Sequence, residues 1–201
     1  MLSNLPQSHF TAISADPPWK FATYSEKGEG RSASRHYDTM ALDQIKMMPV
    51  ADVAAKDCFL FMWGCWPHLR EALDVMEAWG FQYSGVAFTW IKTHKGLDHW
   101  PRSESDLFMG LGYTTRKNSE FVLLGRRGKP VRKSGGVREV IVAPRRAHSE
   151  KPEEFYHRVE TFCDGPYLDL FSRRNRPGWT AFGDQAGKFD SDADALAYML
   201  S

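Results

Sequence analysis

The chain has 201 residues, of which 42% are hydrophobic and 25% are charged, and its formal net charge is +1. This composition excludes disordered, collagen-like and coiled-coil proteins, and the length is that of one generous domain. Three cysteines without a CxxC spacing predict reduced thiols and no metal site. The first residues lack a signal-peptide pattern, and no apolar stretch approaches the roughly 20 residues needed to cross a bilayer. We therefore expect one soluble cytoplasmic domain over residues 1–201 that makes no membrane contact.

The first predicted element is a short apolar strand over residues 11–15. It must end at Asp16, because the two prolines that follow donate no amide hydrogen and force an extended exit. A polar segment rich in glycine and serine over residues 21–38 then predicts a loop. Functional residues often lie where a loop leaves a rigid scaffold. Asp16 is therefore the first candidate for a functional position.

Apolar strands and helical segments alternate along the rest of the chain. The continuous apolar run CFLFMW over residues 58–63 predicts a strand buried on both faces. Helical spacing of apolar residues over 67–79 predicts a helix that Gly80 caps. The other expected helices cover residues 41–55 (broken at Pro49), 152–163 and 190–200, and the other expected strands cover 82–92, 120–124, 137–142, 167–171 and 179–182. This alternation predicts a three-layer α/β domain that binds its ligand beyond the carboxyl ends of the strands.

Positive charge is concentrated in the middle of the chain. Ten basic residues lie between Arg116 and Arg146, against Glu120 and Glu139 alone. Such a basic stripe suits a nucleic acid, because phosphate contacts give affinity that does not depend on base sequence. A solvated, loop-rich surface explains it equally well.

The motif Asp16-Pro17-Pro18-Trp19 predicts transfer of a methyl group to an exocyclic amine. The Asp16 carboxylate and the Pro17 carbonyl can each accept one N–H of that amine. The two prolines fix both acceptors before the reaction, and fixed acceptors stabilise the positive charge that develops on nitrogen. Trp19 offers a flat face for an extruded base. A purely structural turn is the alternative.

Several motifs in the same order resemble the DPPW-type adenine methyltransferases, the family typified by the catalytic subunit that writes m6A in eukaryotic messenger RNA. The matching motifs are ADPPW (15–19), HYDTM (36–40), FLFMW (59–63), WIKT (90–93), HSEKPEEFY (148–156), LDLFSRRNRPGW (168–179) and FGDQ (182–185). The run GLGYTTRKNSEFVLLGRRGKP is most similar to compact bacterial and phage members. The resemblance implies a single methyltransferase domain with a Rossmann-like α/β fold in permuted order, in which the catalytic motif comes first and the cofactor motif last.

The resemblance also implies S-adenosyl-L-methionine as the cofactor. The residues that it implies as cofactor contacts are Asp16, Lys151, Asp169, Arg173, Asn175, Gly183, Asp184 and Gln185. Lys151 precedes a predicted helix N-terminus, where a cation and backbone amides attract anionic groups. Asp169 ends a buried strand and could accept hydrogen bonds from ribose hydroxyls, although a strand-end cap is the alternative. Many family members carry asparagine where this chain has Asp184.

On the substrate side, Tyr37 matches a family position near the target base, and packing of its loop is the alternative. Lys92 ends a strand near the same edge and is a candidate phosphate contact. Arg126 and Arg127, in the basic stripe, are further candidate substrate contacts. Trp63, Trp90 and Trp179 lie in apolar runs, so we expect these three in the core.

The predicted activity is methylation of the adenine amine in DNA, by direct in-line transfer to a flipped base, in a bacterial or phage-infected cell. Three alternatives stay open: the same chemistry on RNA, transfer to the exocyclic amine of cytosine, and a non-catalytic nucleic-acid-binding subunit. Silent family members typically lose the DPPW motif, which this chain keeps. Nucleic acid is therefore the expected partner, and the chain could act as a monomer or a homodimer.

Overall fold

The computed structural model describes residues 2–19, 40–97, 99–112, 114–146, 150–188 and 190. In this part of the chain, seven strands form one sheet in the order β5-β3-β4-β2-β1-β6-β7. The strands are β1 (Phe10–Ala15), β2 (Ala54–Gly64), β3 (Gln82–Thr93), β4 (Ser119–Arg127), β5 (Val140–Pro144), β6 (Tyr167–Leu170) and β7 (Trp179–Phe182). Neighbouring strands are parallel, except that β4 runs antiparallel to both β2 and β3.

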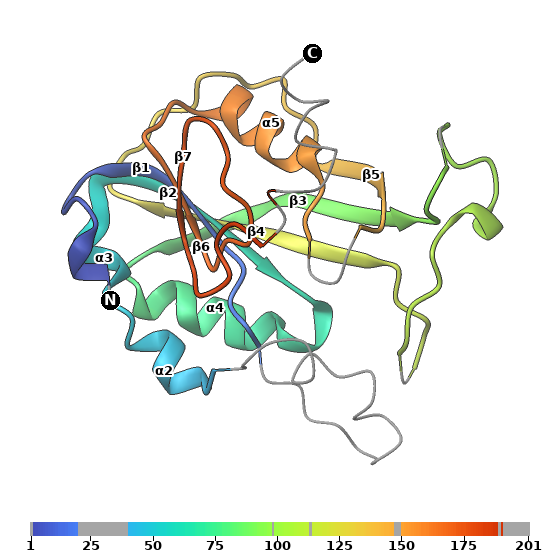
Figure 1. Cartoon of the computed structure of the whole chain (residues 1–201), viewed down its shortest axis with the longest axis horizontal. Coiled ribbons are helices and arrows are strands. Elements are labelled where there is room, and N and C mark those ends of the chain that lie inside the picture. The colour runs from blue at the N-terminus through green and yellow to red at the C-terminus, as the bar shows by residue number, and fades with distance from the viewer. Residues whose placement is uncertain are drawn as a thin grey trace.

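Helices cover both faces of this sheet (Figure 1). The helices are α2 (Leu42–Lys46), α3 (Val50–Val53), α4 (Leu69–Ala78) and α5 (Glu153–Phe162), with short 3-10 segments η1 (Leu2–Asn4), η3 (Trp66–His68) and η4 (Glu104–Asp106). α5 lies on one face, and α2 and α4 lie on the other. The predicted three-layer α/β architecture is therefore confirmed. No helix in the described ranges combines the length and apolar character needed to span a bilayer.

The two hydrophobic clusters explain the apolar run of β2. Leu60 and Met62 belong to the cluster that includes Val75 and Met76 of α4. Phe61, Trp63 and their neighbours belong to the cluster on the α5 side, which is built from aromatic and branched side chains. Successive strand residues point to opposite faces, so a strand covered by helices on both sides is apolar throughout. The predicted core positions of Trp63, Trp90 and Trp179 are confirmed.

α4 ends as the sequence predicts. Gly80 has φ +80°, a left-handed conformation that disfavours residues with a Cβ atom. The Gly80 amide donates to the Glu77 carbonyl (2.9 Å) and the Phe81 amide donates to the Met76 carbonyl (3.0 Å). This pair of hydrogen bonds is the Schellman cap.

Some predicted boundaries are wrong. β2 begins at Ala54 rather than residue 58. The apolar pattern does not reveal this earlier start, because exposed Lys56 and Asp57 interrupt it. β5 begins at Val140 rather than residue 137. The predicted loop over 21–38 and all but the first residue of the predicted helix over 190–200 lie outside the described residues.

One edge of the sheet gathers several strand ends, and we call it the DPPW edge. β1 ends there at Ala15, which pairs with Met62 of β2 and Leu170 of β6. β4 runs the other way and begins at this edge, where Phe121 pairs with Gly64. The residues after β1 and β6 and the first residues of β4 are therefore neighbours.

Candidate active site

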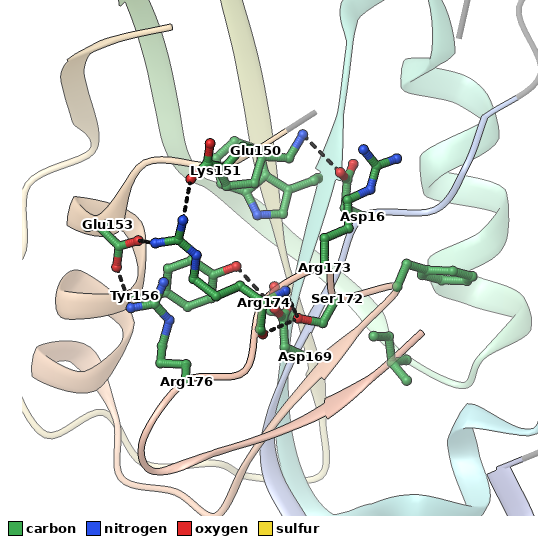
Figure 2. Close-up of a pocket in the computed structure, with 14 residues that line it drawn as sticks. Asp16, Glu150, Lys151, Glu153, Tyr156, Asp169, Ser172, Arg173, Arg174 and Arg176 are labelled. Carbon is green, nitrogen blue, oxygen red and sulfur yellow. Dashed lines mark hydrogen bonds and ion pairs between the residues drawn. The ribbon is translucent and has the colours of Figure 1, made fainter. Parts of the chain in front are cut away.

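A pocket opens at the DPPW edge, beside the ends of β1 and β6 (Figure 2). Its empty volume is about 460 Å³, including space open to solvent. Its lining residues are Ser14, Asp16, Trp63, Glu150, Lys151, Glu153, Tyr156, Asp169, Leu170, Phe171, Ser172, Arg173, Arg174 and Arg176. The pocket therefore unites the first predicted motif with residues before, within and after α5.

A chain of alternating charges begins at Asp16. The ammonium group of Lys151 lies 3.0 Å from Asp16 Oδ2 and 3.1 Å from Glu120 Oε2. Lys92 forms an ion pair with the other Glu120 oxygen, Oε1. The Lys151 ammonium also lies 4.8 Å from the centre of the Trp63 ring, and only 9% of the Lys151 side chain is exposed. Asp16, Lys151 and Lys92 are predicted site residues, whereas Glu120 stands out in the sequence only as an acidic residue within the basic stripe.

The neighbouring charges in this cluster keep Glu120 and Lys151 ionised, and their pKa values reflect this. Burial alone would raise the pKa of Glu120, but Lys151 and Lys92 outweigh burial and lower the pKa to about 2. Burial alone would lower the pKa of Lys151, but Asp16 and Glu120 raise that pKa above its usual value. A cation is therefore held permanently against the Asp16 carboxyl group.

The DPPW turn is fixed by its own backbone. The Trp19 amide donates to the Pro17 carbonyl at 2.8 Å, and the Met40 amide donates to the Pro18 carbonyl at 3.1 Å. A carbonyl oxygen has two lone pairs, so Pro17 keeps the capacity to accept a second hydrogen bond. The sequence therefore provides a rigid carbonyl next to Asp16.

Trp19 is packed into the core rather than displayed. Its side chain is 6% exposed, its ring stacks on His68 (centroids 5.9 Å apart, planes at 15°), and its Nε1 donates to the Trp63 carbonyl. Its burial gives no support to the predicted stacking on a base, which stays a prediction. Trp66, which no predicted motif includes, is 41% exposed at the same edge and is a further candidate contact; its Nε1 donates to Ser119 Oγ at 3.0 Å. Its position directly after the strand motif FMWGC was the available signal.

Asp169 lies at the bottom of the pocket with its carboxyl group buried. The Tyr156 hydroxyl donates to Asp169 Oδ2 at 3.0 Å (Figure 2), and the side chains of Ser14 and Ser172 also form hydrogen bonds with Asp169. Burial raises the pKa of Asp169 despite these hydrogen bonds. The carboxyl group sits at the end of β6, paired in register with Ser14 of β1.

The sequence favours a surface or phosphate-contacting role for Arg174 and Arg176. The structure buries both side chains beside the pocket, so the surface position is wrong, and a phosphate contact stays a prediction. Arg174 pairs with Glu150 (3.0 Å), and Arg176 pairs with Glu153 and stacks on the Tyr156 ring at 3.7 Å. Their side chains are 13% and 7% exposed. Glutamates near the start of α5 compensate their charges, which a local reading of SRRNR cannot reveal. Within the described residues, Arg174 Nε is buried and has no hydrogen-bond partner, so it could donate to a ligand.

Of the remaining predicted cofactor residues, some line the pocket and others do not. Arg173 lines the pocket, whereas the Asn175 side chain donates to Asp190 Oδ2 at 2.7 Å. The turn 183–185 follows β7, and Asp184 is exposed there. A Cβ atom on Gly183 would lie 2.7 Å from the Ser172 carbonyl oxygen. Gly183 therefore allows this turn to approach the end of β6, and the cofactor roles of residues 183–185 and Asn175 stay predictions.

The predicted substrate residues do not gather in one place. Lys92 lies at the DPPW edge, but Arg126 and Arg127 pair with Phe59 and Cys58 near the other end of the sheet. Arg127 follows Glu120 by seven residues along β4, or roughly 24 Å at about 3.4 Å per residue. Its side chain donates to the Ala51 carbonyl. Their position gives no support to contact with the target base, so that role stays a prediction; Tyr37 lies outside the described residues.

Comparison with known proteins identifies the family. The family model MT-A70 matches residues 10–185, a range that contains both the DPPW turn and the turn at Gly183. The chain belongs to the MT-A70 family. The resemblance seen in the sequence is thus confirmed, and the α/β sheet with its pocket is the Rossmann-like methyltransferase fold of MT-A70 proteins.

The chain covers very different shares of its relatives' lengths. The chain is 32% identical over 197 residues to the type II methyltransferase M.MunI of Mycoplasma sp, covering 89% of this chain and 78% of that protein. It is 27% identical over 180 residues to the human N(6)-adenosine-methyltransferase catalytic subunit METTL3, covering 88% of this chain and 28% of that protein. It is 26% identical over 199 residues to the human N(6)-adenine-specific methyltransferase METTL4, covering 90% of this chain and 38% of that protein. The chain thus spans less than two fifths of these two human relatives.

Proposed function

We propose that the protein methylates the exocyclic amine of adenine in DNA, with S-adenosyl-L-methionine as the methyl donor. The observation that carries this proposal is the placement of Asp16. Asp16 lines the pocket, and its carboxyl group forms an ion pair with Lys151. Pro17 follows directly in the chain, and its carbonyl is held by the Trp19 amide. Two fixed acceptors next to a pocket for a small molecule are what transfer to an amine requires. The family match over residues 10–185 supports a single methyltransferase domain.

The residues of the pocket fit S-adenosyl-L-methionine. Asp169 offers a buried carboxylate that can accept hydrogen bonds from ribose hydroxyls, and Arg174 Nε offers a donor for an acidic group. Tyr156 and Arg176 form the wall beside Asp169. When bound, the cofactor supplies a methyl group on a positively charged sulfur.

Asp16 and Pro17 then orient the target amine. The carboxylate accepts one N–H and the Pro17 carbonyl accepts the other, which turns the nitrogen lone pair toward the methyl group. Positive charge develops on the nitrogen during transfer, and both acceptors stabilise it. Lys151 is a positioning residue in this scheme, because it holds Asp16 through a 3.0 Å ion pair. An adenine within a duplex must leave the base stack to reach this depth.

Among the three relatives described above, the one that the chain covers most fully favours DNA as the substrate. M.MunI is a type II methyltransferase, and the match extends over 78% of its length. The human adenosine methyltransferase METTL3 matches over only 28% of its length. RNA is the second candidate because METTL3 belongs to the same family.

The test uses the purified full chain with methyl-labelled S-adenosyl-L-methionine. Double-stranded DNA, single-stranded DNA and RNA of the same sequence are each incubated with the protein and then digested to nucleosides. Mass spectrometry identifies the nucleoside that carries the label. We expect N6-methylated deoxyadenosine from DNA. Label found only in RNA adenosine would overturn the choice of DNA, and label in cytosine or in no nucleoside would overturn the proposed reaction.

A further inference from the structure

The segment between β3 and β4, residues 94–118, extends beyond the sheet at the DPPW edge (Figure 1). We call it the 94–118 arm. Its base is attached to the sheet: Leu107 forms a bridge with Thr93, and the Phe108 amide donates to the Lys92 carbonyl at 2.8 Å. Lys92 is the last member of the charge chain that begins at Asp16. The arm therefore starts where the candidate active site ends.

The outer part of the arm brings two segments of backbone close together. The Gly110 amide donates to the Lys117 carbonyl at 2.8 Å. Side chains at Gly110 and Gly112 would collide with the carbonyl oxygens of Lys117 and Thr115. Both glycines are therefore needed for this contact. Leu111 lies between them, and its side chain is exposed.

The arm displays large apolar side chains. Trp100 is 71% exposed, Met109 is 69% exposed and Leu111 is 60% exposed. Removing such side chains from water is favourable, so three of them exposed along one protruding element indicate a contact surface. These side chains are also free of the two core clusters, so they are not needed for packing of the sheet.

Exposed cations accompany these apolar side chains. They are Lys95, Arg102, Arg116 and Lys117 in the arm and Arg145 at its base, where the guanidinium lies 4.5 Å from the centre of the Phe108 ring. The acidic residues in the same stretch of sequence are Asp98, Glu104 and Asp106. The Asp106 carboxylate is occupied, because it accepts hydrogen bonds from the amides of Arg102 and Ser103 (2.9 and 3.2 Å). The surface thus combines net positive charge with aromatic and aliphatic groups.

We propose that the 94–118 arm binds the nucleic acid beside the target adenine. This inference rests on the proposed function for the class of substrate. Arg116, Lys117 and Arg145 contact phosphates, and Met109, Leu111 and Trp100 contact the bases and sugars next to the extruded nucleotide. Apolar side chains that wedge between bases, and cations that follow the backbone, are general features of proteins that open or distort nucleic acids. The charge favours this occupant over a second copy of the chain, whose own arm carries the same sign.

The test measures binding without methyl transfer. Fluorescence anisotropy of a labelled 20-base-pair DNA duplex and of RNA of the same sequence is recorded at several salt concentrations, with no cofactor present. The variants are the charge reversal Arg116→Glu/Lys117→Glu and the apolar change Met109→Ser/Leu111→Ser. The matched control is Lys56→Glu/Lys129→Glu, which makes the same change of charge at the opposite edge of the sheet, near the start of β2 and the end of β4. Thermal melting verifies that each variant is folded.

We expect the arm charge reversal to weaken binding by at least about tenfold and to lower the slope of log affinity against log salt by about 2. The apolar change should weaken binding by about tenfold and leave that slope unchanged. The control pair should bind as the wild type does.

Wild-type affinity in both arm variants would overturn the inference, as would a loss confined to the control pair or no binding by the wild type. Sedimentation provides a further check: a wild-type dimer that only the arm variants dissociate would show that copies of the chain meet here, and would also overturn it. Different results would overturn the proposed function and the inference about the arm. Arm-dependent binding without adenine methylation would overturn only the proposed reaction, and adenine methylation with arm-independent binding would overturn only the inference.

Discussion

Lys151 holds its ammonium group 3.0 Å from the Asp16 carboxylate, although Asp16 follows β1 near the start of the chain and Lys151 precedes α5. This ion pair joins the DPPW turn to the pocket wall. It fixes the carboxyl group that we propose as an acceptor for the target amine. Four predictions test this arrangement and its surroundings.

Asp16→Ala should lower the methyl-transfer rate by at least about 100-fold, because one of two fixed acceptors for the developing charge is lost. Affinity for S-adenosylhomocysteine, measured by calorimetry, should change little, since Asp169 and Arg174 remain. Asp74→Ala is the control, because Asp74 lies on the surface of α4 and pairs only weakly with Lys46 at 3.8 Å. Normal turnover by Asp16→Ala would refute the proposed mechanism.

Glu120→Gln should reduce stability in a manner that depends on pH. The pKa of Glu120 is about 2 in the folded protein, against an ordinary value of 4.5. Ionised Glu120 therefore stabilises the fold fully above about pH 4.5, and this contribution disappears as the pH falls toward 2. Urea unfolding between pH 3 and 7 should show the stability difference between wild type and variant shrinking with acid. Glu104→Gln, the same change at an exposed position, is the control for the loss of one negative charge. A difference independent of pH for Glu120→Gln would contradict the prediction.

Asp169→Asn should separate stability from cofactor binding. Burial raises the pKa of Asp169, so folding becomes less favourable as the pH rises through the ordinary value of 3.8 and the carboxyl group ionises. At neutral pH the neutral amide removes this cost, and the free energy of unfolding should equal or exceed that of the wild type. Affinity for the cofactor should fall about tenfold or more, because a charged acceptor for ribose hydroxyls is lost.

Tyr156→Phe is the companion variant, since it removes only the hydroxyl that donates to Asp169. It should weaken cofactor binding less than Asp169→Asn does. Unchanged cofactor affinity in Asp169→Asn would leave Asp169 as a strand-end cap.

Gly183→Ala should destabilise the protein by about 1–3 kcal/mol, as overpacking usually does. The added methyl group would lie 2.7 Å from the Ser172 carbonyl oxygen and would push apart the ends of β6 and β7. Gly136→Ala is the matched control, because its Cβ would meet only Ser134 Oγ at 3.7 Å. Thermal melting of both variants decides this prediction, and equal melting temperatures would contradict it.

The sequence was sufficient to predict the fold class and the position of Asp16. The apolar run of β2 follows from burial on both faces, and the prolines after Asp16 end β1 where a ligand can approach. Both signals are local, because they depend on neighbouring residues and on the periodicity of strands and helices. Helix α4 and its glycine cap were predictable for the same reason.

The rest of the site depends on relationships that a linear sequence does not contain. Glu120 and Arg127 lie in one basic stretch of sequence, but the direction of β4 places Glu120 beside Lys151 and Arg127 near Ala51. In the sequence, Arg176 has the pattern of a surface charge, but in the folded protein α5 places Glu153 beside it. Charge density along a chain therefore predicted neither the members of the buried ion pairs nor which cations lie near the pocket.

The reversed direction of β4 has a consequence for how the protein can diversify. The connection before β4 emerges at the DPPW edge, whereas the connection between Arg127 and Val140 turns at the far end of the sheet. Lengthening the first would reshape the arm that we propose to bind nucleic acid, whereas lengthening the second would add residues far from Asp16 and the pocket. The second connection is thus the natural place to graft a fluorescent reporter or an additional module onto a working enzyme.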